Sequence, residues 1–260
     1  MLLAIDSGNT NVVFALIHPN GEIAHRWRIS SENARTADEY VVWLSQLMNL
    51  AGVGFDDVKA AVVATVVPPV LFNLRTLCRQ YFGVEPLVVG APDCDLGISV
   101  MMPNPAEVGA DRLVNAIAGH ARHGGPLIII DFGTATTFDV VDDHGDYHGG
   151  VIAPGINLSM EALHMAAAKL PRIAIERPVT NKVIGKTTVE AMQSGVIWGY
   201  IGLLEGLVDR ITAEWGKPMK VIATGGLAAV FETQSQLIDL VDRDLTLHGL
   251  YMVHQRNLKA

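Results

Sequence analysis

Two segments of the sequence place an aspartate two residues before a glycine and follow the glycine with small or hydroxylated residues. They span residues 2–11 and 127–139. Successive backbone N–H groups in such a turn form a nest that binds anions, and the carboxylate binds Mg²⁺ directly or through water. Glycine in the turn allows close approach of a ligand and a positive φ. Both segments therefore predict phosphate and metal binding.

The two segments follow one pattern. The matching positions are Asp6, Gly8 and Thr10 in the first copy and Asp131, Gly133 and the neighbourhood of residues 135–136 in the second. A second turn follows each segment, at residues 19–22 and 143–146, and one residue of slippage separates the copies. Each copy predicts strand, phosphate-type turn, strand, hairpin turn and strand, which indicates an internal duplication. Two such lobes predict a nucleotide held in a cleft between them.

The elements around these turns predict an α/β fold. In the first half, alternating or continuous apolar runs and capping signals predict the order βββαβαβ, with strands at 2–6, 12–17, 23–29, 59–66 and 85–89 and helices at 40–50 and 68–82. Thr36 and Glu39 fit a capping box before the first helix. Residues 90–105 are predicted to form a loop.

The second half repeats the strand pattern and adds longer helices. The expected elements are helices at 107–123, 157–169, 189–215 and 245–257 and strands from 127, at 148–153 and at 219–223, with irregular structure at 172–182. We expect one lobe over residues 1–115 and a second over 116–260. The second lobe would carry the second phosphate turn and a further turn, Thr224–Gly226, after its last long strand.

Composition excludes several other classes of protein. The chain has 260 residues, half of them apolar, and a net charge of −8 without a polybasic run, which argues against nucleic acid or an anionic membrane as the main partner. Cys78 and Cys94 lack metal or redox spacing. A convincing ligand spacing is also lacking among His120, His123, His144, His148 and His164, which we expect to be structural or surface residues. The sequence has neither a signal-peptide pattern at its start nor an apolar run long enough to span a membrane. We therefore expect a cytoplasmic protein.

Five motifs together resemble type III pantothenate kinases. They are residues 6–11 (DSGNTN), 109–112 (GADR), 131–135 (DFGTA), 149–155 (GGVIAPG) and 188–195 (TVEAMQSG). That family belongs to the acetate kinase, sugar kinase, heat-shock-70 and actin superfamily, so the resemblance implies two duplicated lobes related to ribonuclease H. It also implies ATP-dependent phosphorylation of pantothenate to 4′-phosphopantothenate, the first step toward coenzyme A.

The resemblance assigns a role to each motif. It implies that ATP and its phosphates are bound by Asp6, Ser7, Gly8, Asn9, Thr10, Asn11, Val12, Val13 and Thr134, and pantothenate by Gly109, Ala110, Asp111, Arg112 and Thr188. Asp131 is expected to bind a monovalent cation (K⁺ or NH₄⁺), and Asp6 to bind the Mg²⁺ that accompanies ATP. Residues 224–226 resemble the superfamily's adenosine-contacting turn.

Asp111 is the expected general base. It would accept the proton of the pantothenate hydroxyl as that oxygen attacks the γ-phosphorus, and the dipole at a helix start favours the ionised form that a base needs. From local sequence alone, that dipole is the better explanation of an aspartate in a first helical turn. The resemblance reverses this, because Asp111 lies in GADR at the position of the family's proton acceptor. Arg112 would either bind the substrate carboxylate through its guanidinium fork or form an ion pair within its helix.

The long helix carries glycines at three- and four-residue spacing, at Gly195, Gly199, Gly202 and Gly206. Glycine lowers helix stability, so this stripe indicates close approach of another backbone, either in the core or at a dimer seam. The resemblance favours a homodimer through residues 189–215, with Thr188 contacting pantothenate across the interface. Thr188 also fits an N-cap. Met102 occupies a position where the family often has tyrosine, so a contact to substrate there would be apolar only.

Two alternatives remain open at this stage. One is a kinase or phosphatase of the same superfamily that acts on another small substrate. The other is a non-enzymatic, actin-like nucleotide sensor or regulator. Asp111 argues against the sensor, because a sensor needs no base at an alcohol site.

Overall fold

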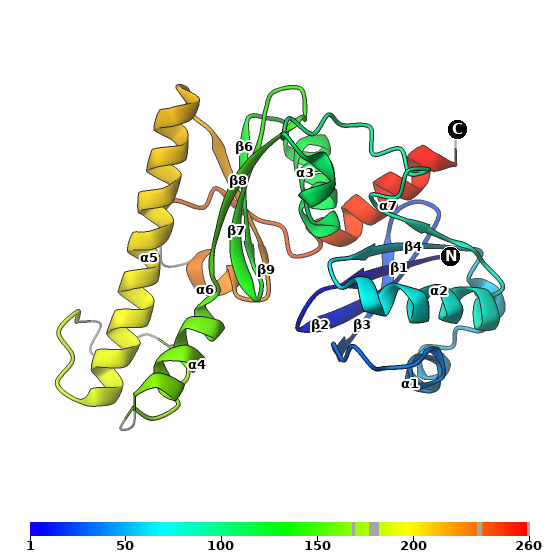
Figure 1. Ribbon diagram of the computed structural model, residues 1–260, viewed down its shortest axis with the longest axis horizontal. Helices are drawn as coiled ribbons and strands as arrows, with labels where there is room; N and C mark the ends of the chain where they lie inside the picture. The colour runs from blue at the N-terminus through cyan, green and yellow to red at the C-terminus, as the bar shows by residue number, and fades with distance from the viewer. Residues whose placement is uncertain (168–169, 177–181, 233–235, 259–260) are drawn as a thin grey trace. The chain divides into compact units, whose positions relative to one another are not determined.

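The computed structural model describes residues 1–167, 170–176, 182–232 and 236–258. The chain forms two compact units, each built around one sheet (Figure 1). The first unit comprises Met1–Gly124, Gly145–Tyr147 and Asp244–Ala260, and the second comprises Gly125–His144 and His148–Arg243. The two units are described separately below.

The first unit contains a five-stranded mixed sheet of order β3-β2-β1-β4-β5. Its strands are β1 (Leu2–Ser7), β2 (Asn11–Ile17), β3 (Ile23–Ser30), β4 (Ala60–Thr65) and β5 (Pro86–Val88). Strands β1, β2 and β3 form an antiparallel meander, whereas β4 runs parallel to β1 and β5 parallel to β4. The predicted order βββαβαβ is confirmed.

Helices cover both faces of this sheet. On one face, Leu3 and Ile5 of β1 share a core with α1 (Ala37–Leu50) and α2 (Pro68–Phe82). On the other face, Ala4 of β1 shares a core with α3 (Ala110–His123) and α7 (Leu245–Asn257). Figure 1 shows α7, in red, beside α3 and the blue strands. The alternation of side chains along β1 therefore fixes both layers.

The second unit contains a sheet of order β10-β9-β6-β7-β8. Its strands are β6 (Leu127–Phe132), β7 (Ala135–Val141), β8 (Tyr147–Pro154), β9 (Lys220–Gly225) and β10 (Leu240–Val241). Strand β7 is antiparallel to β6, and β9 is parallel to it. The helices are α4 (Ile156–Ala166), α5 (Thr188–Trp215) and α6 (Ala228–Glu232). Ile128 and Ile130 of β6 pack with Ile201 of α5 and Phe231 of α6.

The duplication is visible strand by strand. Strands β1 and β6 have the same sequence of buried and partly buried positions, and so do β2 and β7. The hairpin turns that follow place Gly21 at φ +89° and Gly145 at φ +91°. The one-residue slip lies in the first turn, because three residues join β1 to β2 and two join β6 to β7. The fold class predicted from the sequence is confirmed.

Most predicted elements lie where expected, with differences at their ends. The Thr36–Glu39 capping box forms as predicted. The helix expected from 107 begins at Ala110, because Pro105–Glu107 forms a separate 3-10 turn, as does Phe55–Asp57. The helix expected over 157–169 ends at Ala166, and residues 168–169 lie outside the described part. At residues 172–176 and 182 the expected irregular stretch contains neither helix nor strand, and its residues 177–181 lie outside the described part of the chain.

The observed units differ from the expected division at residue 115. That position falls inside α3, and the whole of α3 and α7 belongs to the first unit. The two helices are in close contact, since a Cβ on Gly249 of α7 would lie 2.1 Å from the carbonyl oxygen of Val114. Thr246 also donates a hydrogen bond to the buried Asn115 (2.8 Å). Packing of the last helix on the first sheet is a long-range effect that local sequence patterns do not encode.

Within the described ranges, no helix combines the length and apolar character that crossing a membrane requires.

Candidate active site

The first turn joins β1 to β2 in the first unit. Asp6 is partly buried on β1 between Val13 of β2 and Ala64 of β4. The N–H of Gly8 donates to the carbonyl of Asn11 (3.0 Å) and closes the turn, while residues 9–10 are exposed at its tip. The tip is therefore accessible to a ligand.

Ser31, which directly follows β3, supports this turn. Its N–H donates to the carbonyl of Thr10 (2.9 Å), and its hydroxyl donates to the carbonyl of Gly8 (2.6 Å). Nothing in the sequence analysis singled out Ser31. Its only sequence signal is a hydroxyl one residue beyond the third strand, the position that corresponds to Gly155 in the second copy.

Ser7 and Val12 flank the turn but are buried, with Ser7 only 1% exposed. The Ser7 hydroxyl has no hydrogen-bond partner in the described part of the chain. Val13 is partly buried on β2. At Ser7 and Val12 a bound phosphate would meet backbone groups rather than side chains, because both side chains are enclosed in the core.

The second turn joins β6 to β7 in the second unit. Asp131 lies on β6 between Thr137 of β7 and Thr224 of β9. Gly133 donates its N–H to the carbonyl of Ala135 (3.0 Å), as Gly8 does to Asn11. Thr134 is exposed in this turn.

Gly155, which directly follows β8, supports the second turn. Its N–H donates to the carbonyl of Thr134 (3.1 Å). A Cβ there would lie 2.2 Å from that carbonyl oxygen and 2.8 Å from the oxygen of Gly133. Because Ser31 contacts Thr10 as Gly155 contacts Thr134, Thr10 corresponds to Thr134. The sequence alignment, which placed Thr10 near residues 135–136, was wrong by one or two residues.

The glycines of the two turns do not use positive φ, contrary to the sequence-based expectation. Neither Gly8 nor Gly133 belongs to the positive-φ glycines. A Cβ would lie 3.5 Å from its nearest neighbour at Gly8 and 3.4 Å at Gly133, which is ordinary contact. Any requirement for glycine at these two positions therefore comes from an approaching ligand and not from the protein itself.

Gly225, at the end of β9, has φ +90°. The position of its absent Cβ lies 2.5 Å from Asp131 Oδ1 and 2.7 Å from both the backbone oxygen and the backbone nitrogen of Phe132. A side chain here is excluded twice, by conformation and by contact. Gly225 therefore allows the Asp131 carboxylate and the Phe132 backbone to pack closely against the end of β9. Within the described residues, no group of three His, Cys, Asp or Glu side chains is placed to hold a metal ion.

Asp111 lies in the first turn of α3. Its Oδ1 accepts a hydrogen bond from the N–H of Arg112 (2.8 Å). Burial of the carboxyl raises its pKa above the ordinary value, and this hydrogen bond and the nearby Arg112 charge offset only part of the rise. The sequence argument expected the helix start to favour the ionised form, but desolvation outweighs it. A raised pKa makes the carboxylate a stronger proton acceptor.

Gly109 makes room for this carboxylate. A Cβ on Gly109 would lie 2.5 Å from Asp111 Oδ1 and 3.2 Å from Cγ1 of Val66. Val66 in turn donates its N–H to the carbonyl of Ser7 (3.2 Å). Through Val66, the structure brings the start of α3 next to the end of β1, so the first turn and Asp111 belong to one region of the first unit.

Arg112 lies over the ring of Tyr147, with its guanidinium carbon 5.6 Å from the ring centre. Tyr147 is fully buried. This cation–π contact restrains the guanidinium, whose positive charge also lowers the pKa of the Asp111 carboxyl. Ala110 is buried and Gly109 partly buried.

Thr188 is exposed as the first residue of α5, and the N-cap is its neighbour Thr187, whose hydroxyl accepts from the N–H of Glu190 (3.2 Å). The hydroxyl of Thr188 is therefore not required as a cap. Thr188 borders a mainly apolar cavity of about 650 Å³ within the second unit, also lined by Met160 and Leu163 of α4 and by Met192, Gly195, Gly199 and Leu203 of α5.

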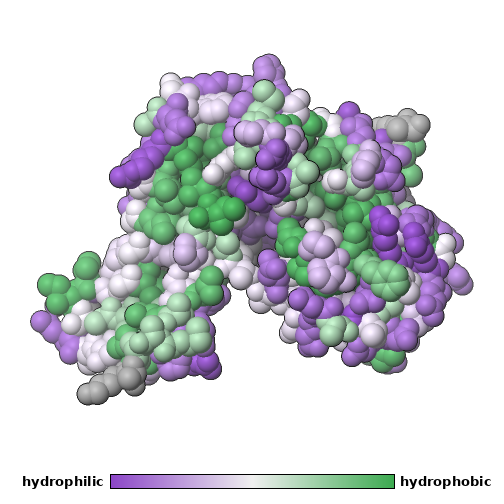
Figure 2. Space-filling model, in the orientation of Figure 1, coloured by the Kyte–Doolittle hydropathy of each residue, from purple (hydrophilic) through white to green (hydrophobic). Residues whose placement is uncertain are grey.

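Apolar side chains are exposed around this cavity. The exposed apolar face consists of Leu158, Leu163 and Met165 of α4, Val183 and Ile184 before α5, and Val189 of α5. Figure 2 shows green surface at the lower left, where Figure 1 places α4 and the start of α5. A Cβ on Gly195, Gly199 or Gly202 would meet no described atom within 4 Å. The close approach indicated by the glycine stripe is thus not core packing within the described part of the chain.

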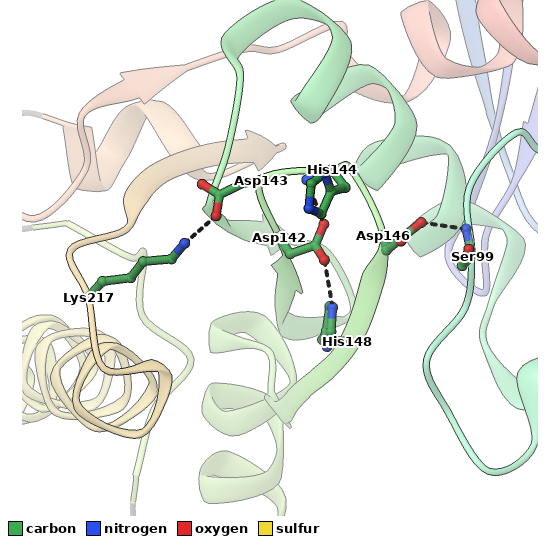
Figure 3. A network of polar contacts seen from close by, with 7 residues as sticks. All are labelled: Ser99, Asp142, Asp143, His144, Asp146, His148 and Lys217. Atoms are coloured by element: carbon green, nitrogen blue, oxygen red, sulfur yellow. Dashed lines mark hydrogen bonds and ion pairs between the residues drawn. The ribbon is translucent and has the colours of Figure 1, made fainter.

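The histidines near the β7–β8 hairpin take part in structural contacts (Figure 3). His148 pairs with Asp142 at 3.0 Å, and its ring packs edge-on against Trp215. Asp143 pairs with Lys217. In the first unit, Asp146 accepts the N–H of Ser99 (2.7 Å). These contacts hold the hairpin in place, and we do not include these residues in the candidate site.

Comparison with known proteins identifies the family of the chain. The family model described as type III pantothenate kinase matches residues 2–210. The chain is 60% identical over 257 residues to the type III pantothenate kinase of Paramagnetospirillum magneticum, covering 99% of this chain and 98% of that one. It is 59% identical over 257 residues to that of Rhodospirillum rubrum, covering 99% of each. The chain belongs to the type III pantothenate kinase family.

Solved structures resemble this family member in fold. A Campylobacter jejuni protein described as a Baf family transcriptional activator matches with a TM-score of 0.62 at 16% identity, covering 99% of this chain and 100% of that one. The activator of 2-hydroxyisocaproyl-CoA dehydratase from Clostridium difficile, solved with bound ADPNP, matches with a TM-score of 0.56 at 12% identity, covering 100% and 97%. At these identities the likeness shows the fold alone.

Proposed function

We propose that this chain is a pantothenate kinase that transfers the γ-phosphoryl group of ATP to pantothenate, giving 4′-phosphopantothenate at the start of coenzyme A biosynthesis. The observation that carries the proposal is membership of the type III pantothenate kinase family along nearly the whole chain. Because the reaction consumes ATP, we place it in the cytoplasm.

We assign the general base to Asp111. The hydroxyl oxygen of pantothenate forms a bond to the γ-phosphorus, the bond between that phosphorus and the β,γ-bridging oxygen breaks, and the hydroxyl proton passes to the Asp111 carboxylate. The raised pKa of Asp111 supports this role, because the proton acceptor is stronger than a solvated carboxylate. The position of α3 beside the end of β1 supports it as well.

The two turns are assigned to ATP. Residues 6–13 would bind phosphate mainly through backbone N–H groups, and Thr134 would contribute from the second turn. Asp6 is the proposed Mg²⁺ ligand. Asp131, with the carbonyl of Phe132 beside it, is the proposed ligand of a monovalent cation, K⁺ or NH₄⁺. These ions would neutralise phosphate charge, which is much of what phosphoryl transfer requires.

Pantothenate is assigned to the start of α3 and to Thr188. Arg112 offers its guanidinium to the substrate carboxylate, and its stacking on Tyr147 limits the conformations it can adopt. Gly109 and Ala110 would border the same substrate. Met102, which is partly buried, would contribute only apolar contact.

We further propose that the enzyme is a homodimer in which a second copy covers the exposed apolar face of α4 and α5. The contact-free glycines of α5 support a backbone of another chain there. In sedimentation velocity, the wild type should be a dimer and the double variant Met165→Glu/Val189→Glu a monomer. Leu50→Glu, which changes an exposed leucine of the first unit, should remain a dimer. A monomeric wild type would contradict the proposal.

The reaction is tested by ADP release from ATP and Mg²⁺, with and without pantothenate, in potassium and in sodium buffers. We expect release that depends on pantothenate and is faster with potassium. ATP binding without pantothenate-dependent release would overturn the kinase assignment in favour of a nucleotide sensor.

A further inference from the structure

Ser31 and Gly155 occupy equivalent positions of the duplicated fold. Each is the first residue after the third strand of its copy, since β3 ends at Ser30 and β8 at Pro154. Each donates its N–H to a turn threonine, Ser31 to Thr10 (2.9 Å) and Gly155 to Thr134 (3.1 Å). The two copies therefore share one backbone bond between the strand end and the turn.

The first copy has a second hydrogen bond, made by a side chain, and the second copy has no room for a side chain at the equivalent position. The Ser31 hydroxyl donates to the carbonyl of Gly8 (2.6 Å). At Gly155, even a Cβ would lie 2.2 Å from a turn carbonyl. The first turn has one residue more than the second, and the alignment of Gly8 with Gly133 and of Thr10 with Thr134 identifies Asn9 as the additional residue. The longer turn leaves space for a side chain at position 31.

The additional bond fixes the orientation of one peptide group. In a trans peptide the carbonyl and the N–H point in opposite directions. Because the carbonyl of Gly8 points to the Ser31 hydroxyl, the N–H of Asn9 points away from Ser31, at the exposed tip of the turn. A flip of this peptide would instead direct a carbonyl oxygen toward a bound phosphate, and the two would repel.

We propose that Ser31 is a positioning residue for ATP: its hydroxyl holds the Gly8–Asn9 peptide in the orientation that offers the Asn9 N–H to a phosphate group. This inference rests on the proposed function, in which the first turn binds the phosphates of ATP. Ser31 acts through the turn and does not itself contact the nucleotide.

The test compares Ser31→Ala with Ser31→Thr, which keeps the hydroxyl. Loss of one neutral hydrogen bond predicts a KM for ATP that rises roughly threefold to tenfold in Ser31→Ala. The KM for pantothenate at saturating ATP should stay within a factor of about two. Ser31→Thr should restore most of the affinity for ATP. As a matched control, Ser45→Ala removes a serine hydroxyl that donates to a carbonyl on α1 (3.1 Å) and should leave both KM values unchanged.

Titration calorimetry with ATP and Mg²⁺ makes the result independent of turnover. Weaker ATP binding in Ser31→Ala alone, with an unfolding midpoint within a degree or two of Ser45→Ala, supports the positioning role. Equal ATP binding in the wild type and Ser31→Ala overturns it, as does a Ser31→Thr variant no better than Ser31→Ala. If the wild type binds ATP but does not phosphorylate pantothenate, the proposed function fails while the calorimetric comparison still decides the role of Ser31.

Discussion

The two phosphate-type turns are built on the same strands and supported in different ways. Burial along β1 and β2 is repeated along β6 and β7, and both turns close with an N–H from glycine to a carbonyl of the next strand. The first turn is longer and is held by a serine hydroxyl, whereas the second is shorter and is packed against Gly155. The strands are alike in the two copies, and the differences lie in the turns and in the residues that support them.

From this contrast we infer that the two units have different roles in the reaction. In the first unit the start of α3, with Asp111, lies beside the end of β1. In the second unit the corresponding carboxylate end of β6 is packed closely against Gly225, and Asp131 there is the proposed cation ligand. We therefore expect damage to the first unit to affect chemistry and phosphate binding, and damage to the second to affect the cation and stability.

The largest effect is expected from Asp111→Asn. Loss of the general base should lower kcat by about 10²–10⁴-fold while ATP and pantothenate still bind. Asp131→Asn should instead abolish the difference between potassium and sodium buffers. Steady-state kinetics of both variants in both buffers checks this, and an Asp111→Asn enzyme with unchanged kcat would remove Asp111 from the mechanism.

The same carboxyl predicts a pH dependence. A base works only when ionised, and burial raises the pKa of Asp111, so kcat/KM should rise with pH through that raised pKa and level off above it. The acidic limb should therefore lie at higher pH than for a solvated aspartate. The residual activity of Asp111→Asn should lack this limb. A wild-type profile that stays flat down to the ordinary pKa of aspartate would contradict the prediction.

The fold could be predicted largely from local patterns. The apolar runs of β1 and β6, the Thr36–Glu39 capping box and the proline-initiated α2 are all signals carried by adjacent residues, and each appears where expected. The short β10 and α6 were not predicted, because two and five residues give too little periodicity. The assignment of α7 to the first unit was also missed, since it depends on contacts across most of the chain.

The site was predicted less completely. Motif residues located the two turns and Asp111, but three features depend on atoms brought together only by folding. Ser31 has no motif of its own. Gly225 is explained by its positive φ and by its contacts with Asp131 and Phe132, and burial raises the pKa of Asp111. For Asp111, the sequence argument weighed the helix dipole and had no means of weighing desolvation.

Substitutions at the two equivalent residues that support the turns, Ser31 and Gly155, should have an intermediate effect on stability. Gly155→Ala places a Cβ against a backbone carbonyl that cannot rotate away, so we expect a loss of about 1–3 kcal/mol in unfolding free energy. Ser31→Gly only removes a hydrogen bond and adds chain entropy, which predicts a loss of about 1 kcal/mol. Urea denaturation measures both. Equal losses would mean that the second turn is no more tightly packed than the first.

The smallest effect is expected at two matched helix caps. Thr36 caps α1 in the first unit, and Thr187 caps α5 in the second, each paired with a glutamate. Each threonine-to-alanine change should lower the free energy of unfolding by about 1 kcal/mol. Thr188→Ala, next to the second cap, should cost less, because its hydroxyl is exposed and caps nothing. A larger loss at Thr188 than at Thr187 would show that the cap assignment is wrong.

The place of α7 in the first unit has a consequence for protein synthesis. Helix α7 shares a core with Ala4 of β1 and with α3, yet it is translated after the entire second unit. At elongation rates of about 5–20 residues per second, the ribosome takes on the order of ten seconds to pass from Gly124 to Asp244. During that interval one face of the first sheet lacks the helix that completes its cover, so the nascent chain exposes apolar surface that a chaperone can recognise.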